Sequence, residues 1–106
     1  MSRFMRLIVF FDLPVVEASD RRQYTKFRKF LLKDGYIMLQ YSVYMRICNG
    51  EDAVQKHMNR LHSRIPRVNG AIRCLKITER QFENMEILLG VKAVEEDFGS
   101  NKTDFF

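Results

Sequence analysis

The hydrophobic positions of this chain change their spacing several times, and each change marks the boundary of a predicted element. Residues 4–11 are almost all apolar and are rich in aromatic and β-branched side chains, which predicts a central strand covered on both faces. In residues 18–35, apolar side chains recur every three or four positions, which predicts a helix. We expect Ser19 or Asp20 to cap this helix and Gly35 to close it.

The spacing changes to two between residues 36 and 48, where apolar and polar side chains alternate. This pattern predicts either one long strand or two short strands that meet at a bend near Ser42. The turn-forming pair Asn49-Gly50 follows. Beyond it, apolar side chains spaced four, three and four positions apart predict a second helix over residues 51–65.

The last segments predict one more strand, a short helix and a strand at the C-terminus. Residues 71–77 are mostly apolar and predict a strand. Thr78 and Gln81 match a capping box, and the spacing that follows predicts a helix over residues 79–89. Residues 103–106 include two Phe and predict a strand that pairs with another segment.

The order strand, helix, two strands, helix, strand predicts an α+β fold, the ferredoxin-like βαββαβ sandwich, with a short extra helix and a C-terminal strand. We expect residues 1–90 to form this domain and residues 91–106 to form an acidic tail that pairs with a partner. Helices would cover one face of the antiparallel sheet. Because the other face would expose the apolar stripe between residues 37 and 47, we expect a homodimer that packs sheet against sheet.

Composition excludes several classes of protein. The chain has 106 residues, of which 46% are hydrophobic and 29% charged. These fractions are ordinary for a globular protein and exclude a disordered one. Cys48 and Cys74 lie far apart and outside any C-x-x-C motif, so we expect core fillers and no disulfide scaffold or cysteine zinc site. The apolar run at residues 7–11 is far shorter than the ~20 residues that span a bilayer. Without a membrane or secretory segment, a cytoplasmic protein is expected.

The charge distribution is uneven. The net charge is +5, but residues 1–80 carry 16 Lys and Arg against 7 Asp and Glu, whereas residues 81–106 carry 2 against 6. A basic body with an acidic tail is typical of a protein that binds a polyanion. On the predicted helices, cations recur about once per turn, a spacing that can follow duplex phosphates without reading bases. The alternative is that these rows are solvated helix faces. The rows comprise Arg22, Lys26, Lys29 and Lys33 on the first helix and Lys56, Arg60 and Arg64 on the second, with Arg67 just beyond.

Asp12 is the candidate metal ligand. A carboxylate at the end of a hydrophobic strand suits Mg²⁺, which could polarise a phosphate or lower the pKa of a bound water. One carboxylate is a poor site, but two-fold symmetry would supply a second Asp12. The alternative is that Asp12 accepts a local hydrogen bond in the turn. His57 and His62 are five positions apart and do not share a helix face, so we expect both on the surface or on the flank of the helix.

Several of these segments together resemble the CRISPR-associated protein two family, in particular its members from type II systems. They are the run Leu7–Pro14, the pair Arg21-Arg22, the stretch Phe27–Tyr44 and the Thr-Glu-x-Gln-Phe segment at Thr78–Phe82. The resemblance covers about residues 4–90. It implies a ferredoxin-like homodimer that lies between two dimers of the CRISPR integrase, holds double-stranded DNA by its backbone, and takes part in the capture of new spacers.

The same resemblance implies a Mg²⁺-dependent endoribonuclease, in some members active on double-stranded DNA, whose metal ligand is the Asp of the first strand. Asp12 matches that position, and Arg21 or Arg22 matches a basic residue early in the first helix. Many members carry Tyr before the Asp. Phe11 stands there in this chain and offers no hydroxyl to a phosphate or water, which weakens the catalytic role and leaves the architectural role intact.

Two further matches concern the second half of the chain. Ser42 and Tyr44 match a Ser-Val-Phe segment of the family, with Tyr in place of the usual Phe. Phe105 and Phe106 match the C-terminal strands that cross to the partner protomer or engage the integrase.

Three functions fit these observations. The first is a DNA-binding structural subunit of a spacer-acquisition complex, which needs only the cations that the predicted helices carry. The second is a Mg²⁺-dependent nuclease with paired Asp12 side chains, which needs more oxygen ligands than the sequence offers. The third is a ferredoxin-like regulator that binds a small ligand. We favour the first.

Overall fold

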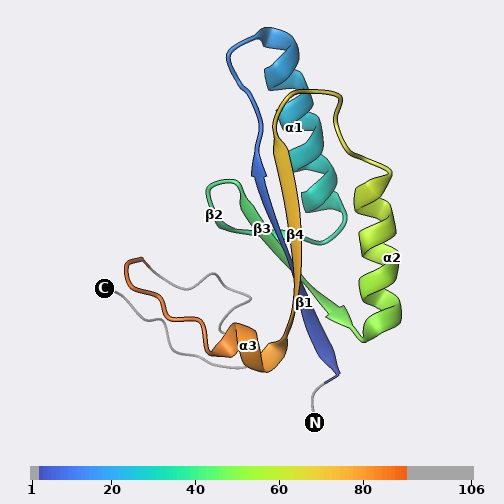
Figure 1. Cartoon of the computed structure of the whole chain (residues 1–106), viewed down its shortest axis with the longest axis vertical. Helices are drawn as coiled ribbons and strands as arrows, with labels where there is room; N and C mark the ends of the chain where they lie inside the picture. Colours follow the sequence, from blue (N-terminus) through green and yellow to red (C-terminus); the bar gives the residue numbers. More distant parts are fainter. Residues whose placement is uncertain (1–2, 91–106) are drawn as a thin grey trace.

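Two helices cover one face of a four-stranded antiparallel sheet, and a third, short helix sits at one end of it (Figure 1). The computed structural model describes residues 3–90. The elements in chain order are β1 (Phe4–Asp12), α1 (Ala18–Lys33), β2 (Ile37–Gln40), β3 (Val43–Asn49), α2 (Glu51–His62), β4 (Ala71–Thr78) and α3 (Glu79–Glu83). The strand order β2-β3-β1-β4 is that of the ferredoxin-like sandwich, so the predicted fold class is confirmed.

β1 lies in the middle of the sheet, as its apolar run predicts. It is covered along the helix side, whereas on the opposite face Ile8 is buried and Phe10 is 39% exposed, so the predicted cover on both faces is confirmed only in part. β1 pairs antiparallel with β3 on one side and β4 on the other. Leu7 and Val9 point to the helices and join a core with Phe27 of α1 and Leu61 of α2. Ile8 points to the opposite face and is only 2% exposed.

α1 spans the stretch that the sequence predicts, but its N-cap is a different residue. Gly35 adopts φ 93°, and the amides of Gly35 and Tyr36 donate to the carbonyl oxygens of Leu32 and Leu31 at 3.2 and 2.9 Å. This is the Schellman motif that closes a helix at glycine. The predicted capping by Ser19 or Asp20 is wrong.

The N-terminal boundary of α1 lies one residue before Ser19. The N-cap is Glu17, which makes no side-chain capping hydrogen bond. The Arg21 guanidinium instead donates to the carbonyl oxygens of Val15 and Val16 at 3.1 and 2.6 Å. These bonds fix the chain before the helix and place Ser19 and Asp20 inside its first turn.

The alternating segment forms two strands that meet at a bend, which is the second of the two alternatives left open by the sequence. Ser42 adopts φ 62°, and its carbonyl oxygen accepts from the Phe11 amide at 3.1 Å. α2 ends at His62 and is therefore shorter than predicted. Ile65, the last residue of the predicted helix, lies beyond its end and is 50% exposed.

The sheet face away from α1 and α2 is covered at one end by α3 and is therefore less open than predicted. Phe82 packs there against Ile8 and Met45. The buried Arg6 guanidinium donates to both carboxylate oxygens of Glu79 at 2.6 and 2.7 Å and lies 4.0 Å from the Phe82 ring centroid. These contacts hold α3 on the sheet.

α3 ends well before the predicted boundary at residue 89. Met85 and Leu89 are 46% and 87% exposed, so the apolar spacing beyond Glu83 is not used for packing within the described residues. The predicted strand at residues 103–106 and the tail at 91–106 lie outside the described residues. Within residues 3–90, no helix has the length and apolar character needed to cross a membrane.

We expect Thr78→Ala to lower the free energy of unfolding by about 1 kcal/mol, because Thr78 forms the predicted capping box. Its Oγ1 accepts from the Gln81 amide at 3.0 Å, and its own amide donates to Gln81 Oε1 at 2.9 Å. In a domain of this size the melting temperature should fall by about 4–8 °C. Thr25→Ala, at an exposed position of α1, is the control and should leave it unchanged or slightly higher. Equal melting temperatures for the two variants would contradict the capping role.

Candidate nucleic-acid interface

The two predicted rows of cations lie on the same side of the molecule, because α1 and α2 cover the same face of the sheet (Figure 1). Lys26 of α1 and Arg64, just after α2, both line a groove of about 390 Å³ that Arg67 also lines. Lys33 and Arg60 line an adjoining pocket of about 310 Å³, which shares Arg64 with the first. The structure thus joins the two rows into one basic surface.

The remaining predicted cations lie outside this groove. Arg21, Arg22, Lys26 and Lys29 line a shallow depression along the outer side of α1. Lys56 is exposed on α2 and lines neither the groove nor that depression. Arg21 differs from the others, since its guanidinium is engaged by the carbonyl oxygens before α1. It therefore positions the loop that follows Asp12.

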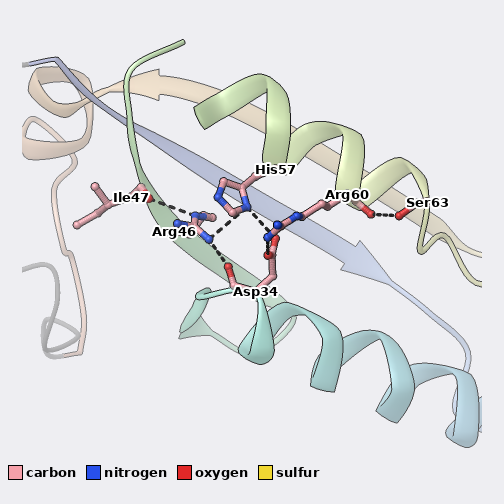
Figure 2. A network of polar contacts seen from close by, with 6 residues as sticks. All are labelled: Asp34, Arg46, Ile47, His57, Arg60 and Ser63. Carbon is pink, nitrogen blue, oxygen red and sulfur yellow. Dashed lines mark hydrogen bonds and ion pairs between the residues drawn. The ribbon is translucent and has the colours of Figure 1, made fainter. Parts of the chain in front are cut away.

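A polar network beside the adjoining pocket ties the end of α1 to α2 and β3 (Figure 2). Asp34 Oδ1 accepts from Arg60 Nη1 at 2.6 Å, and Asp34 Oδ2 lies 2.9 Å from His57 Nδ1. Arg46 of β3 donates to the backbone carbonyl oxygen of Asp34. The network fixes the relative positions of the two helices that carry the basic rows.

His57 is buried, with 5% of its surface exposed, so its predicted surface position is wrong; His62 is exposed as predicted. The reason lies in the spacing along α2. His57 is three residues after Val54 and four before Leu61, so it belongs to the inward stripe of the helix. That spacing, together with an Asp at the end of the preceding helix, is the sequence signal that could have revealed the pair.

The Asp34 carboxylate is held in its charged form. Burial alone would raise its pKa, but hydrogen bonds from His57 and Arg60, with the charges of both groups, outweigh burial and lower the pKa below its usual value of 3.8. Asp34 therefore offsets part of the charge of Arg60, whereas within residues 3–90 no carboxylate pairs with Lys26, Arg64 or Arg67.

Asp12 is the last residue of β1 and is exposed. It lies beside Ser42 in a pocket of about 220 Å³, so the structure brings these two predicted residues together. Tyr44 does not join them, because its ring is buried on the helix side and its hydroxyl accepts from Arg28 Nε at 2.8 Å. The pocket is lined by Phe10, Phe11, Asp12, Tyr41, Ser42, Val43, Ala71 and Arg73.

Gly70 holds the start of β4 close to Asp12. A Cβ at Gly70 would lie 2.6 Å from the Asp12 carbonyl oxygen, and its φ is 151°. Only glycine allows this approach. The Phe11 ring packs between Phe27 and Tyr44, with centroids 5.3 and 5.6 Å away, so it belongs to the core.

The described residues of one chain do not by themselves fit a Mg²⁺ site. No group of three or more His, Cys, Asp or Glu side chains that could hold a metal occurs within residues 3–90. The Asp12 pocket offers one carboxylate with the hydroxyls of Ser42 and Tyr41, and Arg73 adds a positive charge. Mg²⁺ prefers several oxygen ligands. A second carboxylate from outside this set is needed.

Sequence reasoning missed Tyr41 and Arg73 in this pocket. Tyr41 is 78% exposed beside Asp12, at the bend between β2 and β3. Arg73 comes from β4, whose antiparallel pairing sets Ala71 opposite Asp12 and Arg73 opposite Phe10. The signal for Arg73 is the strand pairing, which follows from the fold and not from any local motif.

The cysteines are core residues, as predicted. Cys48 is buried and Cys74 half-buried, and both thiols are free. Burial, with a small contribution from Cys48, raises the pKa of Cys74 to about 11, and burial also raises the pKa of Cys48. Neither thiol is a nucleophile near neutral pH.

The fold and this surface define a ferredoxin-like protein with a basic helical face and a lone strand-end aspartate. The family model of CRISPR associated protein Cas2 matches residues 5–85. Three similar relatives are each named "CRISPR-associated endoribonuclease Cas2". One from Acidovorax ebreus is 56% identical over 92 residues, covering 87% of this chain and 89% of the relative. One from Ligilactobacillus salivarius is 43% identical over 91 residues, covering 86% and 89%. One from Flavobacterium psychrophilum is 38% identical over 104 residues, covering 98% and 90%.

This chain belongs to the CRISPR-associated protein Cas2 family. The resemblance found in the sequence is confirmed, and with it a CRISPR-associated function.

We expect Asp34→Asn to lower the free energy of unfolding by about 2 kcal/mol above pH ~4, because it weakens hydrogen bonds to a charged group. The folded-state pKa of Asp34 is below 3.8, so its stabilisation is complete above that value and is lost as the pH falls further. Urea denaturation of both proteins from pH 6 to about pH 3 measures the difference, which should shrink at the acidic end. Asp52→Asn, exposed in the first turn of α2, is the control with a smaller effect. A difference that does not depend on pH would contradict the ion pair.

Proposed function

We propose that this protein is the dimeric nucleic-acid-binding subunit of the CRISPR adaptation complex, which bridges integrase dimers and holds duplex DNA during spacer acquisition in antiviral defence. The observation that carries the proposal is the joining of both cation rows into one surface on the helix side of the sheet. Phosphate contacts of this kind need no base recognition, and they suit a protein that accepts any sequence.

The opposite face of the sheet supports the dimer. Outside the area covered by α3, Phe10 and Leu75 are 39% and 49% exposed. Phe10 pairs with Val43, and Leu75 with Ile8, so both lie on the face away from α1 and α2. A second copy packed sheet against sheet would bury them and leave the basic helices on both outer sides, where a duplex or an integrase dimer can reach them.

β4 supports the expected role of the C-terminal strand. It is an edge strand, with β1 as its neighbour on one side and no strand of residues 3–90 on the other. An edge strand can accept an added strand through its free backbone groups. Phe105 and Phe106, in the terminal segment, are the residues that we expect to engage the partner protomer or the integrase.

A second function, a Mg²⁺-dependent endonuclease acting on RNA or double-stranded DNA, is favoured by the name endoribonuclease that the relatives carry. Asp12 is exposed at the end of β1 and free to serve as a ligand. Because a single chain offers one carboxylate in this pocket, this function requires the Asp12 of a second protomer.

We expect the triple variant Arg22→Gln, Lys26→Gln and Lys29→Gln to weaken duplex binding and flatten its dependence on salt. Each lost phosphate contact should reduce the slope of log K against log salt by about 0.9. Fluorescence anisotropy with blunt duplex DNA over a salt series measures both quantities. Lys76→Gln is the control, because that ammonium already pairs with Glu51 at 3.2 Å. A slope that the triple variant leaves unchanged would refute the phosphate contacts.

We expect Asp12→Ala to leave duplex binding within about twofold of the wild type, because the change removes an exposed carboxylate. If the nuclease function is real, the wild type cleaves RNA or duplex DNA in Mg²⁺ and the variant does not. Gel assays of labelled substrates, with and without chelator, measure this. Cleavage that persists in the variant would eliminate Asp12 as the metal ligand, and loss of duplex binding would contradict the separation of the two sites.

A further inference from the structure

The groove between α1 and the segment that follows α2 has the size of a small-molecule site. Its volume of about 390 Å³ falls in the range of pockets that hold a single small ligand. A double helix, whose major groove alone is about 12 Å wide, cannot enter a space of this size. The duplex-holding role therefore uses the rim of this groove and leaves its interior unexplained.

The interior of the groove is strongly cationic. Lys26, Arg64 and Arg67 line it, and no acidic residue does. The adjoining pocket contains Asp34, but that carboxylate is already bonded to Arg60 and His57. Three positive charges thus converge where no carboxylate of residues 3–90 neutralises them.

The inner wall of the groove is aromatic. Phe27 and Phe30 line it, with ring centroids 6.4 Å apart, and the Arg64 guanidinium lies 5.6 Å from the Phe30 centroid. Phe30 is only half-buried. Aromatic rings and guanidinium planes are the surfaces on which unpaired nucleobases stack. Phe27 is buried in the core, so the accessible part of this wall is Phe30. Cations and one accessible aromatic ring in one small groove match both parts of a nucleotide.

We propose that this groove binds a nucleotide that carries a phosphomonoester, either free or at the end of a nucleic-acid strand. A phosphomonoester has a charge of about −1.5 to −2 at neutral pH, which suits three cations better than the single charge of a phosphodiester. Arg64 and Arg67 can each grip phosphate oxygens with two parallel hydrogen bonds, and Lys26 adds a point charge.

The C-terminal end of α2 works against an anion, because a helix carries partial negative charge there. Its carbonyl groups are capped within the chain. The Ser63 amide donates to the carbonyl oxygens of Asn59 and Arg60, its hydroxyl donates to Arg60 at 2.7 Å, and the Arg64 amide donates to Leu61. The exposed partial charge is reduced, and the guanidinium groups dominate the groove.

The helices beside the groove are tied to each other before any ligand arrives. Figure 2 shows Arg60 of α2 reaching Asp34 at the end of α1, with His57 and Arg46 against the same residue. A prearranged site loses less conformational entropy on binding. The groove shares no lining residue with the Asp12 pocket, and packing of the opposite sheet face would leave it open. This inference therefore goes beyond the proposed function and does not depend on it.

The test compares short single strands that differ only in a terminal phosphate, with a fluorophore on the opposite end. The full chain is titrated at low salt without Mg²⁺. We expect a 5′- or 3′-phosphate to strengthen wild-type binding about tenfold, and we expect Arg64→Gln/Arg67→Gln to abolish this gain. Arg22→Gln/Lys29→Gln removes the same charge from the outer side of α1 and should keep the gain.

Equal binding of phosphorylated and hydroxyl-ended strands by the wild type would overturn the proposal, and so would an equal loss of the gain in both double variants. Should the double variant fail to fold, Arg67→Gln alone replaces it in the test, because it retains the Arg64 contact with Phe30. We expect this single variant to lower the gain severalfold. Competition by a nucleoside monophosphate would support the free nucleotide as ligand, and competition by a phosphorylated strand alone would support the strand end. Failure to bind blunt, hydroxyl-ended duplex would refute the proposed function while leaving the phosphate-dependent gain in place.

Discussion

The burial of both faces of β1 at its centre is the constraint on which the rest of the structure depends. Leu7 and Val9 on one face are 0% exposed, and Ile8 on the other is 2% exposed. A strand of this kind must have cover on each side. α1 and α2 supply it on one face, and α3 supplies it over part of the other, where the Arg6–Glu79 pair and Phe82 hold α3 in place. The apolar area that α3 leaves exposed is the basis for the proposed dimer.

The same arrangement determines where the charge lies. Because α1 and α2 turn their apolar stripes inward to β1, their cations are left on the outward faces. The network of Asp34, His57, Arg46 and Arg60 ties the end of α1 to α2 and β3, beside the pocket that Asp34 and Arg60 line next to the groove. This polar cluster thus ties together the two helices that carry most of the cations on which both proposals depend.

The fold was predictable because most of its elements have a recognisable local pattern in the sequence. The apolar run of β1, the helical spacing of α1 and α2, the closing Gly35 and the capping box at Thr78 all appear in the structure. The predicted cap of α1 and the predicted end of α3 were wrong, because tertiary contacts determine both. Arg21 fixes the loop before α1, and without packing beyond Glu83 the apolar residues after α3 do not extend the helix.

The site was predictable only in part. The cations could be read from helical spacing, and Asp12 from its place at the end of an apolar strand. Arg73 and Tyr41 reach the Asp12 pocket through strand pairing and a bend. His57 lies on the inward stripe of α2, but its partner Asp34 is 23 positions earlier in the chain. Contacts over such separations follow from the assembled fold and leave little trace in a single sequence.

Sedimentation velocity of the full chain, alone and with one duplex, tests the central claim most directly. The account predicts a dimer of the wild type and a complex with two chains on each duplex. Leu75→Lys on the open sheet face should give a monomer with weaker duplex binding, whereas Ile65→Lys, with nearly the same exposure on the helix side, should remain a dimer. The contradicting result would be a wild type that is monomeric and binds the duplex with the same affinity as both Leu75→Lys and Ile65→Lys.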